Sequence, residues 1–120
     1  MYAERQTITA TTAADGSATV YSANVNGRID AIQYVKAVSG SFDDGVGITV
    51  TGETTGRAIL IVANMNASAT YCPLIPARKA ADGTASTLTE IPVLLVNERV
   101  KIVIASGGNA KAGSFYLTVA

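Results

Sequence analysis

The strongest pattern in this chain is an alternation of apolar and polar residues, and it is most regular in residues 97–120. Two runs there place an apolar side chain at every second position: Val100, Ile102 and Ile104, then Phe115, Leu117 and Val119. A period of two residues is typical of strands that bury one face. Residues 106–113 contain three glycines and favour a turn. The pattern predicts a terminal β-hairpin on which the rest of the chain packs.

Two more hairpins are expected earlier in the chain. Residues 6–11 and 17–21 are rich in β-branched side chains and flank Asp15-Gly16, a dipeptide that favours tight turns. Residues 46–51 and 57–63 flank a loop bounded by two glycines. The core side chains expected from this second hairpin are Ile48, Val50, Leu60 and Val62.

A central strand is expected at residues 28–36, entered through a turn at residues 24–27. Strict alternation places Ile29 on one face of this strand and Ile32 and Tyr34 on the other. Both faces therefore carry apolar side chains, which favours a position inside a sheet.

The strand pattern stops between residues 64 and 88. Connections longer than about 12 to 15 residues are uncommon in compact domains and tend to be functional, so we expect a long loop that another protein holds in place. Its expected contacts to that partner are three apolar anchors and one charged anchor: Tyr71, Leu74, Ile75 and Arg78. Alternatively, the apolar residues 71–76 form a short edge strand, where proline is tolerated.

About eight short strands without helical periodicity indicate the fold class. We expect an all-β chain in which residues 1–120 form a single domain, an antiparallel β-sandwich of the jelly-roll or Ig-like kind with a long loop near 64–88. The pattern does not distinguish these topologies.

The charge content limits the possible partners. Charged residues make up 15% of the chain, against about 25% in a typical soluble domain, and nine basic residues balance nine acidic ones. Either part of the surface is covered by other copies or another protein, or it is an uncharged Ser/Thr/Ala-rich solvent face. No basic cluster favours nucleic acid, no apolar run is long enough to span a membrane, and the start of the chain lacks a signal-peptide pattern. We therefore expect synthesis in the cytoplasm.

The candidate chemistry is sparse. The chain has no histidine, its single Cys72 has no thiol partner or activating base and is expected to act as a small apolar side chain, and no phosphate-binding glycine motif is present. Asp43 and Asp44 fit a turn better than a calcium site, because the EF-hand spacing is absent. Few aromatic residues are available to stack on sugars. We expect no enzyme activity, no cofactor and no metal.

Several segments resemble one protein family. They are VNGRI at 25–29, YVK at 34–36, ITVTGETTG at 48–56, NMNASAT at 64–70 and VNERVKIVIASGGNAKAGSF at 96–115. In this order they look like the small capsid-decorating or minor capsid head proteins of tailed bacteriophages and prophages. The chain departs from that family pattern across residues 71–92, where the partner contacts are expected.

The resemblance implies a structural role in a virion. A protein of this kind binds the outside of the major capsid shell, as a homotrimer, and stabilises the shell. Two alternatives remain open at the level of sequence: an Ig-like virion module that binds host-surface glycans, and a component of the head–tail connector or tail.

Overall fold

The computed structural model describes residues 3–65 and 67–120, and these residues form strands and loops without a helix. The strands are β1 (Glu4–Thr11), β2 (Ala18–Lys36), β3 (Gly47–Gly52), β4 (Ala58–Ala63), β5 (Ala69–Tyr71), β6 (Leu74–Arg78), β7 (Ala85–Ala105) and β8 (Ala112–Val119). All the strand pairings are antiparallel. The all-β antiparallel fold class is therefore confirmed.

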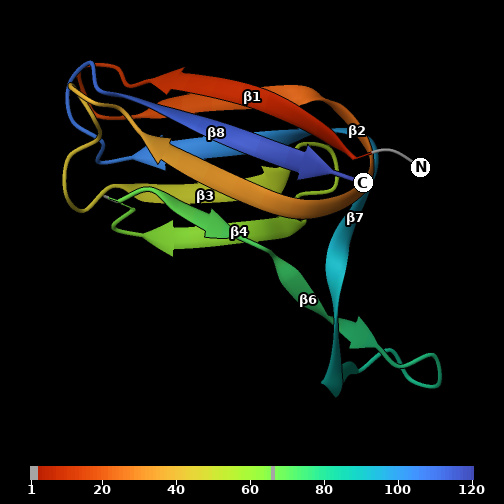
Figure 1. The fold of residues 1–120 in the computed structure, drawn as a ribbon. Helices are drawn as coiled ribbons and strands as arrows, with labels where there is room; N and C mark the ends of the chain where they lie inside the picture. The colour runs from red at the N-terminus through yellow and green to blue at the C-terminus, as the bar shows by residue number, and fades with distance from the viewer. Residues whose placement is uncertain (1–2, 66) are drawn as a thin grey trace.

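The strands belong to one connected sheet that folds over into a sandwich-like body (Figure 1). The strand order is β1-β8-β2-β7-β3-β4, with β5 paired to β2 and β6 paired to β7. The long strand β2 joins the two layers, because its first half pairs with β7 and its second half pairs with β8. One layer thus contains β1, β8 and the end of β2, and the other contains the start of β2 with β7, β3 and β4.

Irregularities in β2 let this strand serve both layers. Its pairing shifts register between Tyr21 and Asn24 and between Val25 and Asn26, and again between Ile29 and Ala31. Each extra residue increases the local twist and bends the strand. The turn predicted at residues 24–27 is therefore wrong, since the chain continues there as part of β2.

The last of these shifts also changes which side chains are inside. Ile29, Ile32 and Tyr34 are all buried, although strict alternation placed Ile29 on the face opposite to the other two. The extra residue between Ile29 and Ala31 reverses the alternation, so all three side chains reach the core.

The core lies between the two layers, and every strand of the body contributes to it. The faces predicted for the end of the chain are confirmed, because Val100, Ile102 and Ile104 are buried, as are Phe115, Leu117 and Val119. Tyr34 stacks on Phe42 with 5.9 Å between the ring centroids and lies 5.4 Å from Phe115. The enclosed position of Tyr34 raises the pKa of its hydroxyl by desolvation.

Two of the three expected hairpins are wrong in their pairing, although their strands exist. β7 and β8 are not hydrogen-bonded to each other; both flank β2, each along a different half. Likewise β1 pairs with β8, whereas the strand after the Asp15 turn pairs with β7. In both cases the short connection crosses from one layer of the body to the other, so the two strands that it joins cannot pair with each other.

The hairpin of β3 and β4 is confirmed, with Val50 opposite Leu60 and Ile48 opposite Val62. Ile48 and Val50 are buried, while Leu60 and Val62 are only partly buried because β4 is the last strand of its layer. Ile59, the extra residue at the register shift beside Val50, is also buried.

The segment at 64–88 is not the structureless loop that the sequence suggested. It contains β5, β6 and the start of β7, so the alternative interpretation of residues 71–76 as edge-strand structure is the closer one. β6 and the first part of β7 leave the body together as a ribbon (Figure 1). We call this ribbon, residues 74–92, the arm.

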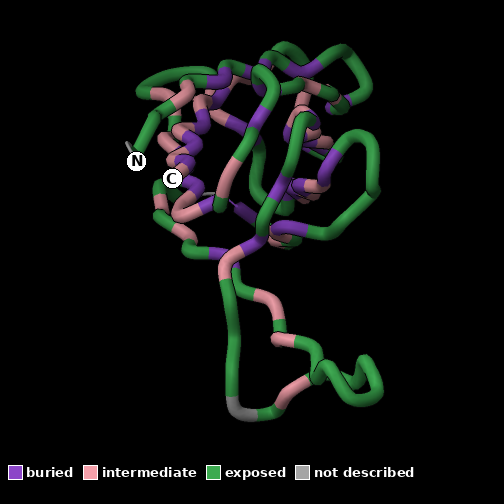
Figure 2. The backbone as a smooth tube through the Cα atoms, turned by 90° about the vertical axis from the view of Figure 1, so that its right-hand side faces the viewer, coloured by how far each residue is buried: buried purple, intermediate pink, exposed green. Residues whose placement is uncertain are grey.

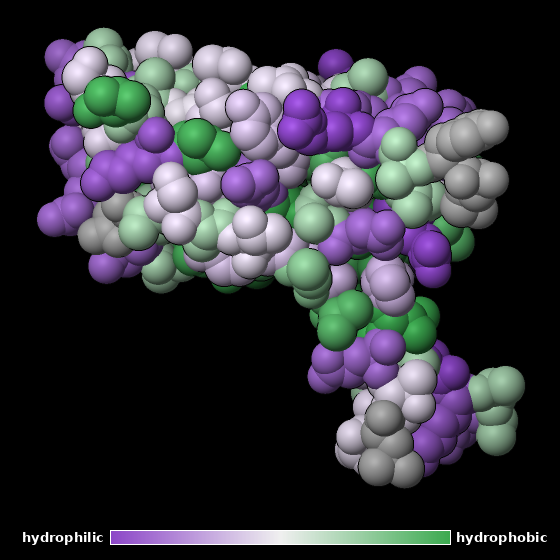
Figure 3. All heavy atoms as spheres, in the orientation of Figure 1, coloured by the Kyte–Doolittle hydropathy of each residue, from purple (hydrophilic) through white to green (hydrophobic). Residues whose placement is uncertain are grey.

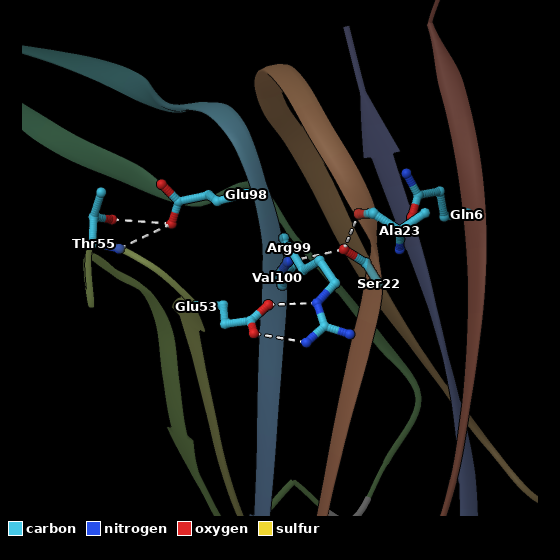
Figure 4. Close-up of polar contacts among 8 residues, drawn as sticks. All are labelled: Gln6, Ser22, Ala23, Glu53, Thr55, Glu98, Arg99 and Val100. Carbon is cyan, nitrogen blue, oxygen red and sulfur yellow. Dashed lines mark hydrogen bonds and ion pairs between the residues drawn. The ribbon is translucent and has the colours of Figure 1, made fainter.

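Buried polar side chains tie β7 to its neighbours (Figure 4). Glu98 accepts hydrogen bonds from the Thr55 hydroxyl at 3.1 Å and from the Thr55 N–H at 3.4 Å, which holds the turn between β3 and β4. Ser22 accepts a hydrogen bond from the Val100 N–H at 2.9 Å and donates one to the Ala23 carbonyl at 2.7 Å. Ser22 thereby completes the backbone pairing at the first irregularity of β2.

Candidate partner-binding surface

The arm is built from two strands and a hydrogen-bonded turn. Leu74 lies opposite Pro92 and Ile75 opposite Ile91, and a wide register shift follows before Arg78 meets Ala85. In the turn, the Lys79 N–H donates to the Thr84 carbonyl at 2.9 Å. The Asp82 carboxylate accepts hydrogen bonds from the hydroxyl and N–H of Thr84, and these bonds lower the pKa of Asp82. Local polar bonds therefore close the tip of the arm.

The arm has no core of its own. None of its residues with a described side chain is buried, whereas buried residues run through the body (Figure 2). A two-stranded ribbon without a packed face is marginally stable in water. An arm of this shape gains most from packing against a second molecule.

An apolar stripe runs along the outer face of β7 from the base of the arm onto the body. Leu74 lies opposite Pro92, and alternation along β7 places Leu94 and Val96 on the same face as Pro92. Leu74 and Leu94 are each 51% exposed and Val96 is 68% exposed. Apolar residues are visible where the arm joins the body in Figure 3. We call Leu74, Leu94 and Val96 the outer stripe.

Two arginines lie beside the outer stripe. Arg28 is directly opposite Leu94 in the pairing of β2 with β7, so both side chains are on the outer face. Arg57 donates a hydrogen bond from Nη1 to the Leu94 carbonyl at 3.1 Å. The buried core of a protein interface is more apolar than its rim, and arginine is enriched at interfaces, so this surface has the composition of an interface.

Another arginine on the body is already neutralised within the chain. Arg99 forms a two-pronged ion pair with Glu53 (Figure 4) and lies over the Tyr21 ring at 4.2 Å from its centroid. The hydrogen bond from Arg99 lowers the pKa of Glu53. The ion pair joins β7 to the turn that follows β3, so it braces the body.

The four predicted contact residues separate into two groups. Leu74 is exposed on the outer stripe, and Arg78 is exposed at the end of β6. Tyr71 and Ile75 are half-buried and pack against the core of the body, with Tyr71 opposite Ile32 in the pairing of β5 with β2. Tyr71 and Ile75 thus support the base of the arm. Cys72 between them is exposed and does not pack as the small apolar side chain expected from the sequence.

Sequence reasoning missed the part of the surface that belongs to β7. Leu94 and Val96 lie outside residues 64–88, where the partner contacts were expected. The signal was present in the unbroken apolar run from Ile91 to Val96, because a strand with apolar side chains on both faces needs cover on both. Only Val93 and Leu95 find that cover inside the body.

The structure gives no sign of a metal centre or a membrane span in the residues it describes. Across residues 3–65 and 67–120, no group of three or more His, Cys, Asp or Glu side chains is placed to hold a metal ion. Asp43 lies in a turn in which its carbonyl accepts the Val46 N–H at 3.3 Å. No helix in this part of the chain is long and apolar enough to cross a membrane.

Comparisons with known proteins identify no family for this chain. No model of a protein family matches it, and no curated protein sequence matches it either. Its fold is weakly similar to a crystal structure of FLHE, with a TM-score of 0.47 and 10% sequence identity over 99% of this chain and 98% of that one.

Proposed function

We propose that this protein is a structural virion protein that decorates a phage capsid, binding the outside of the major capsid shell as a homotrimer and stabilising it. The observation that carries the proposal is the arm, which extends from the body without a core of its own and has an exposed apolar stripe at its base. The sequence resemblance to capsid-decorating proteins supports the setting. The nine basic residues are balanced by nine acidic ones and form no basic cluster in the sequence, which favours a protein surface over nucleic acid as the partner.

The outer stripe defines what the partner surface must offer. Leu74, Leu94 and Val96 need an apolar groove, and the neighbouring Arg28 and Arg57 favour carboxylates at its rim. Docking would also bury side chains of the arm that no second layer covers in the free protein. Binding and ordering of the arm are thus expected to occur together.

Stabilisation of the shell follows from mass action. A protein that binds the assembled shell and not its separated subunits stabilises the shell by RT ln(1 + [L]/Kd) at each site, or about 2.7 kcal/mol when the free concentration is 100 times Kd. A homotrimer presents three arms at once, so each bound arm raises the effective concentration of the next. Modest affinity per arm is then sufficient.

The test is the number of copies in the virion. We expect hundreds of copies in purified particles of the phage that encodes the protein, measured by quantitative gel densitometry against the major capsid protein. Shells that lack the protein should bind it when it is added and should disassemble at a higher temperature afterwards. About a dozen copies or fewer would assign the protein to the connector or tail, and binding to a glycan array without shell binding would assign it to host recognition.

Substitutions in the outer stripe test the contact itself. The double variant Leu94→Ser/Val96→Ser should bind shells at least about tenfold more weakly in a co-sedimentation titration, because it removes two apolar contacts at the expected interface centre. Val38→Ser is the matched control, since Val38 is fully exposed in a loop away from the arm. Equal loss in both variants, or no loss in either, would contradict the assignment of the stripe.

A further inference from the structure

We infer that β4 is a self-association edge: it pairs antiparallel with β4 of a second copy and continues one layer of the sheet across two chains. β4 ends its layer, is hydrogen-bonded to β3 on one side, and pairs with no described strand on the other side. In Figure 1 it forms the lower border of the body. This inference does not depend on the proposed virion role.

The other exposed edges carry the features that block such pairing. β1 has the charged residues Glu4 and Arg5, β5 has only three residues, and β6 contains Pro76 and ends at Arg78. Charges, short length and proline are the usual means by which proteins protect an edge strand. β4 has none of them, because its sequence AILIVA is six uncharged residues without proline. The first half of β2, which pairs only with β7, is a further edge, but two register shifts interrupt it and the Gln6 side chain already accepts a hydrogen bond from its Ala23 N–H at 3.0 Å. Among the described strands, β4 is therefore the regular edge that carries none of these protective features.

The side chains of β4 are also left incompletely covered. Leu60 and Val62 point toward the core but remain only partly buried, and Ile61 on the opposite face is 70% exposed. A strand added beside β4 would cover all three. A second copy of β4 fits this edge because it brings uncharged side chains of the same kind, so the contact buries no unpaired charge.

The faces of the sheet fix the register of the pairing. Opposed residues of an antiparallel pair lie on the same face, so inward residues must oppose inward residues. Pairing about a two-fold axis at Ile61 meets this condition: Ile61 opposes Ile61 of the second copy on the outer face, and Leu60 opposes Val62 on the inner face. A two-fold contact uses the same surface on both chains and closes at two. The two-fold contact can join two single copies or two trimers, and in either case it doubles the mass of the particle in solution.

Cysteine cross-linking tests the pairing and its register. Directly opposed residues of an antiparallel pair have Cα atoms about 4.5 to 5.5 Å apart, which is within the range that a disulfide spans. In a Cys72→Ser background, Ile61→Cys should give a covalent dimer on a non-reducing gel that disappears with reductant. Thr9→Cys in the same background is the control, since Thr9 is exposed on the charged edge strand β1. Equal cross-linking at both positions, or none at position 61, would overturn the inference.

Light scattering after size exclusion gives an independent measurement. Ile61→Lys places a charge on the open edge and should halve the mass of the wild-type particle, whereas Thr9→Lys should leave it unchanged. Because Ile61 is mostly exposed, the lysine variant is expected to keep the fold, which far-UV circular dichroism checks. A folded Ile61→Lys protein with the wild-type mass would show that β4 does not pair.

Discussion

At the scale of single residues, the residue type at several positions is determined by the close approach of neighbouring atoms and not by hydrophobicity. Gly52 is an example: a Cβ atom there would overlap the buried carboxylate of Glu98 and stand 3.0 Å from the Thr55 hydroxyl. That carboxylate already accepts two hydrogen bonds from Thr55 and has little freedom to move. The end of β3, the following turn and β7 therefore meet at a point that tolerates only glycine.

Gly52→Ala is expected to destabilise the protein by about 1 to 3 kcal/mol, because the added methyl group displaces a buried, hydrogen-bonded carboxylate. The free energy of unfolding from urea titration measures the effect. Gly47→Ala is the matched control in the same strand, since nothing lies within 4 Å of the Cβ position there. Similar losses in the two variants would mean that backbone conformation, and not the Glu98 contact, is responsible.

The ion pair of Glu53 with Arg99 predicts a dependence of stability on pH. Arg99 holds the pKa of Glu53 below its usual range through a hydrogen bond, so the folded state binds the proton less readily than the unfolded state does. The stabilisation is therefore present above the unfolded pKa of about 4.3 and is lost as pH falls through the lower folded value. The difference in Tm between wild type and Glu53→Gln should be present at pH 7 and disappear in acid. One molar salt should also reduce it, because both groups are partly exposed.

At the scale of strands, the sequence predicted which residues are extended far better than which strands are neighbours. Alternation is local, so the faces of Val100, Ile102 and Ile104 could be assigned correctly. Pairing depends on where the chain crosses between layers, and no residue type marks that crossing. The turns after β1 and β7 have the composition of hairpin loops, yet each joins strands of different layers.

Substitutions on the two faces of β7 test which face is buried. Ile102 is 1% exposed, so Ile102→Ala should reduce the free energy of unfolding by about 2 to 5 kcal/mol through lost burial and a residual cavity. Val103→Ala on the opposite face of the same strand, where the side chain is half-buried, should cost clearly less. A loss below about 1 kcal/mol for Ile102→Ala would mean that the two faces are exchanged.

Part of the candidate surface was predictable and part was not. The failure of alternation in residues 64–88 predicted a loop, and the segment instead contains strands; it nevertheless overlaps the arm, on which Leu74 and Arg78 are exposed. The same apolar composition gave no way to separate Tyr71 and Ile75, which pack on the body, from Leu74, which does not. That distinction depends on the register of β6 with β7, which is a property of the folded chain.

At the scale of the whole molecule, the chain is more extended than a compact domain of its length. Its radius of gyration is 15.1 Å and its longest dimension is 49 Å, whereas 120 residues in a compact domain give about 14 Å. The arm accounts for the difference, since it leaves the body as a two-stranded ribbon (Figures 1 and 2). Under the proposed function, the arm and the outer stripe at its base serve binding, and the buried core of the body serves folding.

Removing the arm tests that separation. Replacing residues 77–89 by a short Gly-Ser turn keeps β5, Tyr71 and Ile75 on the body and removes no buried side chain among those described. The shortened protein should remain folded with a Tm within a few degrees of wild type, because shortening a loop costs little and no core contact is lost. Its binding to capsid shells should be weaker, because Arg78 and most of the ribbon are removed, while Leu74, Leu94 and Val96 stay in place.

A wider replacement separates the two roles of the region further. Exchanging residues 69–86 for a linker also removes β5 and the side chains of Tyr71 and Ile75, which pack against the core. This variant should lose about 2 kcal/mol or more of stability in urea titration, since two partly buried apolar side chains and the pairing with β2 disappear. If the narrow replacement were as unstable as the wide one, the arm would be part of the folding unit, and its loss of shell binding would no longer identify it as the contact surface.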